Sequence, residues 1–287
     1  MLAGVLFPRG QGESVSVTDQ AFETLQTRMT PSGVLTVSLN RPRRGNAINM
    51  AMWRDLFSLF AAMARDPVVR AVIITGNAAS FCTGMDLGVF ADMSALLESE
   101  TCEGRKREAL LRAISYFQRG ISLFESSPVP TIACVSGSCL GGAIDLITAC
   151  DLRMCTRNSE FSVKEVDLAI VADLGTLQRL PILVGEMKAR DLALTGRHFS
   201  GDEAVEMGLC LGPVFATEEE MLAAAVSKAE TIAQKSPLTI RGIKTSLNFS
   251  RDHSVQEGLD HVRMLNAAQI YSVDLLESNM KKPFSLP

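Results

Sequence analysis

Short apolar segments, long enough only for strands, alternate with segments of helical spacing over the first two thirds of this 287-residue chain. The clearest strand candidates are Val68–Thr75 and Pro130–Ser136, which are apolar along almost their whole length. Strands that are apolar on both faces are typical of parallel sheets covered by helices. Helical spacing alone fills the last third of the chain. The sequence therefore predicts an α/β fold with a helical C-terminal region.

The remaining elements follow from turn residues, β-branched runs and helical spacing. Further strands are expected at Phe22–Thr27, Gly33–Leu39, Asp151–Cys155, Glu160–Val163 and Leu209–Phe215. Helices are expected at Asn49–Ala64, 91–125, Ile144–Ala149, from near Leu174 to a break at Pro181–Gly185, Glu186–Leu194, Gly201–Met207, Thr217–Gln234, Leu238–Asn248 and Ser254–Leu276. We accordingly expect a flexible N-terminal tail (1–20), an α/β core (21–215) and a C-terminal helical region (216–287).

Composition excludes several classes of function. With 28 basic and 32 acidic residues, the chain has no excess of positive charge for nucleic acid or an anionic membrane. No run of 18 uncharged apolar residues is present to span a membrane. The seven cysteines are odd in number and include no CxxC pair, which favours buried, reduced thiols over disulfides or a zinc site. We expect no metal ion.

The stretch Phe161–Leu180 carries two candidate catalytic carboxylates, Glu165 and Asp173, in largely apolar surroundings. Burial raises the pKa of a carboxyl group, and a raised pKa suits proton transfer near neutral pH. Each residue also has a simpler interpretation from the residues alone. Glu165 is then a solvated residue at a strand end, and Asp173 is the N-cap of a helix that begins near Leu174.

Two loops are candidate binding elements. The glycine-rich turn 137–143 joins a strand to a helix, and such a turn directs free backbone N–H groups toward an anion or oxyanion. Close packing of glycines is the alternative. The loop 40–47 contains Arg41, Arg43 and Arg44, which are either phosphate contacts or solvated residues. Asp145 follows the glycine turn, where a negative charge is favourable at a helix N-terminus.

Five segments in this order resemble the crotonase family (enoyl-CoA hydratase/isomerase) over essentially the whole chain after residue 20. They are Leu39-Asn40-Arg41-Pro42 with Asn46-Ala47, Phe81–Leu87, Gly137–Gly142, Ala149–Arg153 and Gly175–Leu180. The resemblance implies a ββα spiral core of stacked sheets with a C-terminal helical trimerisation region. It also implies a homo-oligomer, a trimer or a hexamer, that acts on a coenzyme A thioester and needs no other cofactor.

The resemblance also assigns roles to particular residues. The backbone N–H groups of Met85 and Gly142 would form the oxyanion hole, and Arg41, Arg43, Arg44 and Ala47 would contact coenzyme A. Asp145, Glu165 and Asp173 together are similar to the set in Δ3,5-Δ2,4-dienoyl-CoA isomerases, since hydratases usually have Glu at position 145 and a small residue at position 173.

In the isomerase interpretation, Glu165 removes the C2 proton, Asp173 delivers a proton to C6, and Asp145 orients or tunes the pocket. Which of Glu165 and Asp173 is the base stays open. A 2-enoyl-CoA hydratase and a non-catalytic acyl-CoA-binding protein are the alternatives. Ile170 and Val171 are bulkier than the small residues that are common there, which predicts a narrower pocket.

Fatty-acid β-oxidation chemistry points to an organelle. The N-terminal segment, with Arg9 and no acidic residue before Glu13, weakly resembles a mitochondrial transit segment. The C-terminal Ser285-Leu286-Pro287 differs from the Ser-Lys-Leu peroxisomal signal. We therefore expect a mitochondrial protein, with a peroxisome-like organelle or the cytosol as alternatives.

Overall fold

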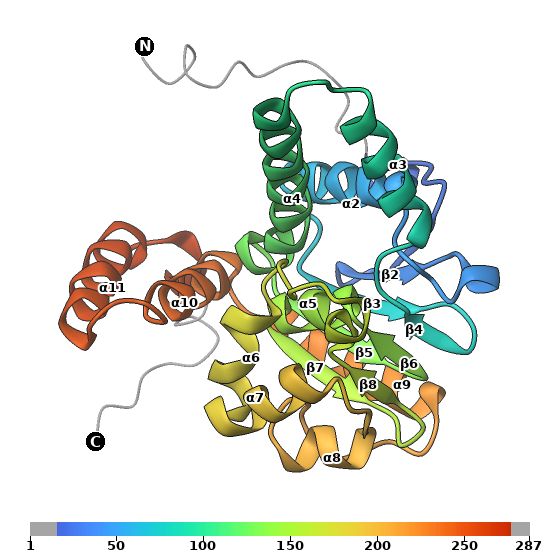
Figure 1. Cartoon of the computed structure of the whole chain (residues 1–287). Coiled ribbons are helices and arrows are strands. Elements are labelled where there is room, and N and C mark those ends of the chain that lie inside the picture. The colour runs from blue at the N-terminus through green and yellow to red at the C-terminus, as the bar shows by residue number, and fades with distance from the viewer. Residues whose placement is uncertain (1–15, 277–287) are drawn as a thin grey trace.

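A computed structural model of the chain describes residues 16–276 and contains two sheets that share one core (Figure 1). The five-stranded sheet has the order β1-β2-β3-β5-β7, and the four-stranded sheet has the order β4-β6-β8-β9. In chain order the strands are β1 Leu25–Met29, β2 Val34–Leu39, β3 Ala71–Gly76, β4 Ser80–Cys82, β5 Thr131–Val135, β6 Ser138–Leu140, β7 Leu152–Cys155, β8 Glu160–Ser162 and β9 Phe199–Ser200.

The chain passes repeatedly from the larger sheet to the smaller one. Strands β3, β5 and β7 are each followed within a few residues by β4, β6 and β8, and helices lead back to the next strand. Pairing is parallel except for β1 with β2 and β8 with β9. This winding is the expected ββα spiral of stacked sheets, and the α/β fold prediction is confirmed.

The longer helices are α2 Met50–Met63, α3 Leu87–Glu98, α4 Glu103–Ser126, α5 Gly142–Ala149, α6 Thr176–Val184, α7 Glu186–Thr195, α8 Gly201–Glu206, α9 Glu218–Ala233, α10 Pro237–Phe249 and α11 Val255–Gln269. Short 3₁₀ turns are η1 Val17–Asp19, η2 Pro42–Arg44 and η3 Lys164–Leu168. The expected cap at Asn49 is present, since its side chain accepts a hydrogen bond from the N–H of Met52 (2.9 Å).

Helices cover both faces of the five-stranded sheet. Helix α9 buries Met221, Ala225, Ala229 and Ala233, a stripe with a spacing of four residues, against one face. In Figure 1 its orange ribbon passes behind the green strands. The other face packs against α2, α4 and α5 in the main core. The expected boundary between the core (21–215) and the C-terminal helical region (216–287) therefore lies just before α9, a helix that packs against the sheet of the core.

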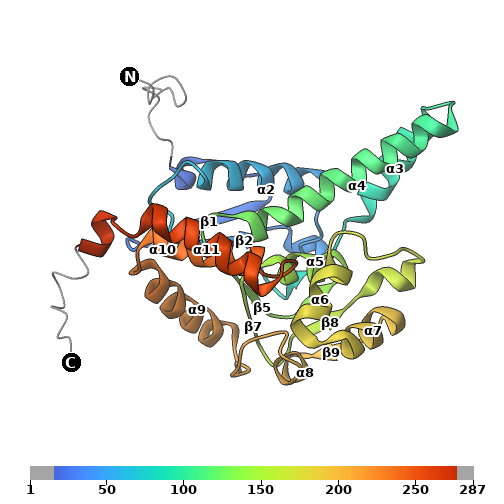
Figure 2. The ribbon, with the colours of Figure 1, turned by 90° about the vertical axis from the view of Figure 1, so that its left-hand side faces the viewer.

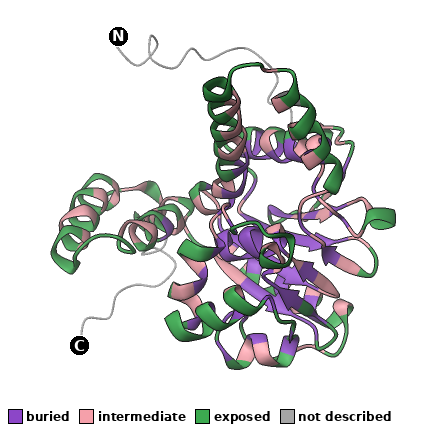
Figure 3. Cartoon of the chain, viewed as in Figure 1, coloured by how far each residue is buried: buried purple, intermediate pink, exposed green. Residues whose placement is uncertain are grey.

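Helices α10 and α11 extend from the body as an arm, and α3 with α4 form a second projection (Figures 1 and 2). The arm has few buried residues. Lys244 is buried in α10, and α11 buries none, whereas every residue of the central strands β3 and β5 is buried (Figure 3). Within residues 16–276, no helix has the length and apolarity required to cross a bilayer.

Several expected elements differ in the structure. The residues expected as one helix over 91–125 form two, α3 and α4. The break expected at Pro181–Gly185 is confined to Gly185, because a proline removes only its own N–H donor while its carbonyl still accepts from Gly185 (3.0 Å). The expected strand Leu209–Phe215 is irregular apart from one bridge between Phe215 and Thr156, since Pro213 has no N–H for a ladder.

Three short strands, β4, β6 and β9, were missed in the sequence analysis, because two or three residues show no usable alternation. Most of the expected tail, residues 1–15, lies outside the described residues, as do residues 277–287. Residues 16–20 are attached to the body: Val17 is buried, and its N–H donates to Asp66 (3.1 Å).

Candidate active site

A cavity of about 420 Å³ is lined on one side by α3 and α4. Its lining comes from five separate parts of the chain: residues 44–47 at the end of η2, the segment from Thr83 into α3, the middle of α4, the glycine turn at the start of α5, and residues 164–174. Six of the nine predicted site residues line it: Arg44, Ala47, Met85, Gly142, Glu165 and Asp173. The spiral thus brings together residues that are up to 129 positions apart.

Glu165 lies in η3, directly after the short strand β8, and not at an exposed strand end. The turn continues to Ala169, which has a left-handed backbone (φ 57°), and the N–H of Ile170 donates to the Glu165 carbonyl (3.1 Å). Burial, reinforced by the charge of Asp145, raises the pKa of the Glu165 carboxyl to about 7. This value suits a group that accepts a proton near neutral pH.

Asp145 lies on α5 behind the cavity wall and is 1% exposed. Burial raises its pKa to about 6, although the N–H of Thr176 donates a 2.6 Å hydrogen bond to its Oδ1 atom and opposes the rise. The second oxygen, Oδ2, has no hydrogen-bond partner among the described residues, and neither has Oε2 of Glu165. Two buried, unsatisfied carboxylate oxygens are costly for folding alone and are typical of a site that receives a ligand or a water molecule.

Asp173 lies in the segment that leads into α6, and burial raises its pKa. The alternative that Asp173 caps a helix is wrong, because α6 begins at Thr176 and its N-cap position is occupied by Gly175. The Asp173 carboxyl therefore has no structural task at the helix end and lines the cavity with Glu165.

The amides of Met85 and Gly142 lie close together on the cavity wall. A Cβ atom added at Gly142 would be 3.6 Å from the Met85 nitrogen. Gly84, with φ 88°, adopts the left-handed turn that allows this approach. Within residues 16–276 neither N–H donates to another backbone group; the adjoining bonds are Ile48 N–H to Gly84 and Asp86 N–H to Ile48. The two donors are free to bind one oxygen atom.

The arginine-rich loop is only partly directed at the cavity. Arg44 and Ala47 line it, whereas Arg43 is exposed outside it. Arg41 has an internal role: its Nη1 atom donates to Oδ2 of Asp86 (2.7 Å) and to the Ala47 carbonyl. The side chain of Asp86 in turn caps α3. Arg41 therefore ties the loop of Ala47 to the start of α3.

A large part of the lining is apolar. It comes from α3, α4 and the residues after η3, namely Leu87, Phe90, Met93, Ile114, Phe117, Leu168, Ile170 and Leu174. Of the two bulky residues noted in the sequence, Ile170 lines the cavity, whereas Val171 is 70% exposed. Sequence analysis missed the contributions of α3 and α4, because the spacing of apolar residues on a helix does not show whether they line a cavity or pack in the core.

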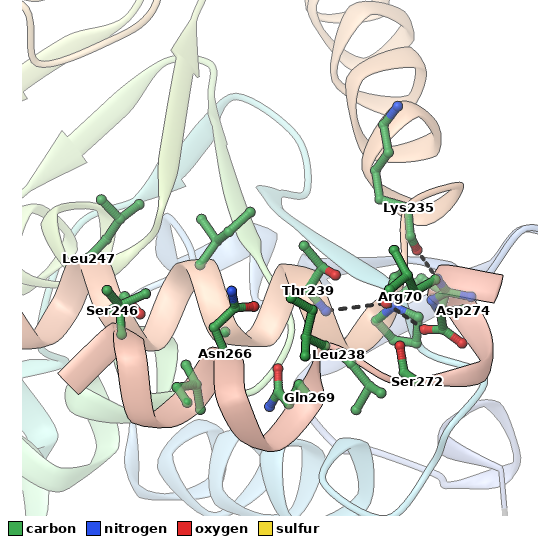
Figure 4. A pocket seen from close by; sticks show the side chains of 18 of the residues that line it. Arg70, Lys235, Leu238, Thr239, Ser246, Leu247, Asn266, Gln269, Ser272 and Asp274 are labelled. Carbon is green, nitrogen blue, oxygen red and sulfur yellow. Dashed lines mark hydrogen bonds between the residues drawn. The ribbon is translucent and has the colours of Figure 1, made fainter. Parts of the chain in front are cut away.

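A larger cavity of about 780 Å³ lies between α10, α11 and the end of α9 (Figure 4). One end is closed by Arg70, whose guanidinium donates to the Lys235 carbonyl (2.5 Å). Asp274 is its only carboxylate among the described residues, and no glycine turn opens into it. It lacks the chemistry of the smaller cavity. Residues 16–276 also hold no group of three or more His, Cys, Asp or Glu side chains suited to a metal ion.

Comparison with known proteins agrees with the fold and with the arrangement of the site. The chain matches the enoyl-CoA hydratase/isomerase family over residues 29–280. It is 41% identical to the peroxisomal Δ(3,5)-Δ(2,4)-dienoyl-CoA isomerase of Arabidopsis thaliana, covering 91% of this chain and 95% of the relative. It is 38% identical to the mitochondrial Δ(3,5)-Δ(2,4)-dienoyl-CoA isomerase of Mus musculus, covering 91% and 80%.

Among solved structures, the enoyl-CoA hydratase of Bacillus anthracis superposes with a TM-score of 0.80 at 29% identity, covering 91% of this chain and 96% of that one. The chain belongs to the enoyl-CoA hydratase/isomerase family, as the resemblance read from its five motifs predicted.

Proposed function

We propose that this protein isomerises 3,5-dienoyl-CoA to 2,4-dienoyl-CoA. One observation carries the proposal: two carboxyl groups with raised pKa values, Glu165 and Asp173, line a single cavity onto which the amides of Met85 and Gly142 also face. Moving two conjugated double bonds by one carbon requires loss of a proton at C2 and gain of a proton at C6. The reaction therefore needs a base and an acid at separate points of one pocket.

In the proposed mechanism, the thioester oxygen accepts hydrogen bonds from the N–H groups of Met85 and Gly142, which stabilise the enolate. Ionised Glu165 takes the C2 proton, and the electron pair moves through the diene to C6. Protonated Asp173 gives its proton to C6. Glu165 then holds one proton more and Asp173 one proton less, so exchange with solvent restores both groups before the next turnover.

The protonation states that this mechanism needs agree with the surroundings of each group. At pH values near 7 and above, a substantial share of Glu165 is ionised, because its pKa is about 7. Burial favours the neutral form of Asp173. We assign Glu165 as the base and Asp173 as the acid.

The alternative function is hydration of a 2-enoyl-CoA by Asp145 and Glu165. Hydration needs a water held between two carboxylates and has no use for an acid at position 173. Asp145 lies behind the wall with one oxygen engaged by Thr176, which favours an orienting role. The two relatives described above are named isomerases, and this supports the same conclusion.

We further propose that Arg44, Ala47 and Arg43 contact the coenzyme A part of the substrate, with Arg44 nearest the cavity. Lys164 also lines the cavity and adds a positive charge at its wall. Arg41 is proposed to act indirectly, by fixing the position of Ala47. The substrate carries coenzyme A itself, and the proposal requires no separate cofactor.

The arm of α10 and α11 exposes apolar side chains that a monomer would leave in water, including Leu247 (64% exposed) and Met264 (67%). We propose that this surface mediates homo-oligomerisation, as a trimer or a hexamer. The named relatives are mitochondrial or peroxisomal. We propose an organellar location, and the mitochondrion stays a prediction.

The decisive experiment supplies purified protein with a 3,5-dienoyl-CoA and, separately, with a 2-enoyl-CoA, and follows both by ultraviolet absorbance. Rapid formation of the conjugated 2,4-dienoyl-CoA with slow hydration of the 2-enoyl-CoA is expected. Rapid hydration without isomerisation would replace the proposal with the hydratase alternative. Binding without either reaction would indicate a non-catalytic acyl-CoA-binding protein.

A further inference from the structure

The position of the Asp173 carboxyl group is set by its backbone. Within residues 16–276 no other side chain donates a hydrogen bond to this carboxyl, whereas the peptide groups around it are held individually. The carbonyl of Asp173 accepts from Nε2 of Gln118 (2.7 Å), and the carbonyl of Leu174 accepts from Nη1 of Arg179 (3.3 Å). The N–H of Thr176 donates to Asp145 (2.6 Å).

Arg179 packs directly against this segment. A Cβ atom added at Gly175 would lie 1.8 Å from Nη1 of Arg179, so the guanidinium occupies the space that any side chain at position 175 would need. Gly175 also has φ 126°, a backbone conformation that favours glycine. The glycine and the arginine form one unit, in which the guanidinium supports the backbone that carries Asp173.

The guanidinium is itself held in place. Its Nε and Nη2 atoms both donate to Oε2 of Glu125, at 3.1 and 2.7 Å, and these two charge-assisted hydrogen bonds hold the guanidinium. The other carboxylate oxygen of Glu125 pairs with Arg251, which follows α10. Arg179 is 12% exposed, so water screens this pairing little. Only Nη1 of Arg179 remains for the Leu174 carbonyl.

We propose that Arg179 and Gln118 are positioning residues for Asp173, which hold the acid at the C6 end of the substrate without touching it. The inference rests on the proposed function. The proposal predicts a selective effect. Loss of the hydrogen bond from either residue should slow proton delivery at C6 and leave proton removal at C2 by Glu165 intact. A displacement of about 1 Å in a reacting group can lower a rate by about a hundredfold.

The test separates the two proton transfers in D2O. Isomerisation is followed as formation of the 2,4-dienoyl-CoA, and C2 exchange as deuterium in the recovered 3,5-dienoyl-CoA by mass spectrometry. For Arg179→Met and for Gln118→Met, we expect isomerisation to fall at least about tenfold and C2 exchange to change by less than about threefold. Arg179→Lys, which retains the cation, should recover part of the isomerisation rate.

Arg190→Met is the matched control, because Arg190 is an exposed arginine on α7 whose one ion pair within residues 16–276 is with Glu186, a helical turn earlier. It should leave both rates unchanged. Gln118→Met removes a single neutral hydrogen bond at an exposed position, so it tests the proposal even if Arg179→Met does not fold. Equal losses in both rates, or no loss in either, would overturn the proposal. Wild-type protein that neither isomerises nor exchanges would instead overturn the proposed function.

Discussion

The N–H of Thr176 donates a 2.6 Å hydrogen bond to Oδ1 of Asp145, and this bond joins the helix behind the cavity to the segment that carries Asp173. One of the three site carboxylates is thereby attached to the segment that carries another. Asp145 is 1% exposed, and burial disfavours the ionised form of its carboxyl group. Keeping this carboxyl ionised therefore lowers the stability of the folded protein.

This cost predicts a pH-dependent gain in stability for Asp145→Asn. The pKa of Asp145 rises from its ordinary 3.8 to about 6, which corresponds to about 3 kcal/mol. Because the folded pKa is the higher one, wild-type stability is lost as pH rises from about 4 to about 6. The free energy of unfolding of the variant relative to wild type should therefore increase by about 3 kcal/mol between pH 4 and pH 8. Denaturant titrations at both pH values measure this, and a constant difference would contradict it.

Because the two proton transfers use different carboxyl groups, two isosteric variants should differ in C2 exchange. Glu165→Gln should lose both C2 exchange and isomerisation, by about 10²- to 10⁴-fold, because it removes the base. Asp173→Asn should lose isomerisation by a similar factor and keep C2 exchange. Deuterium incorporation and product formation, measured in one reaction, distinguish them. If Asp173→Asn isomerised at the wild-type rate, Asp173 would not be the acid.

The pH profile of kcat/KM should be bell-shaped. Glu165 must be ionised to act, and its pKa is about 7, so activity should fall about tenfold per pH unit below that value. Asp173 must be protonated, so activity should also fall at pH values above the raised pKa of its carboxyl group. Initial rates at low substrate concentration between pH 5.5 and 9.5 test both limbs. A profile that stays level from pH 5.5 to 8 would refute the assignment of Glu165.

Most of the site residues that the sequence predicted line the cavity, because the chemistry of this family is recorded in short local motifs. Glu165, Asp173 and the glycine turn stand in such motifs, and their place along the chain identified the family. The parallel sheet was predictable from a different local signal, because β3 and β5 are apolar on both faces.

Relationships between distant residues were not accessible from the sequence. Arg41 pairs with Asp86, 45 residues away, and not with solvent. Gln118 reaches the Asp173 carbonyl across 55 residues, and a glutamine on an otherwise charged helix gives no sign of this. The short strands β4 and β6 also depend on partners in the second sheet rather than on local propensity.

The last prediction concerns recognition of coenzyme A. Arg44 lines the cavity and forms no salt bridge within residues 16–276, so its charge is available to phosphate oxygens. Arg44→Gln should raise KM for a 3,5-dienoyl-CoA by about tenfold, the effect of losing one charged hydrogen bond, with kcat nearly unchanged. The same variant should behave like wild type toward the corresponding pantetheine thioester, which lacks the phosphates. Arg190→Gln provides the control for loss of a surface arginine. An equal rise in KM with both thioesters would show that Arg44 shapes the cavity and does not bind phosphate.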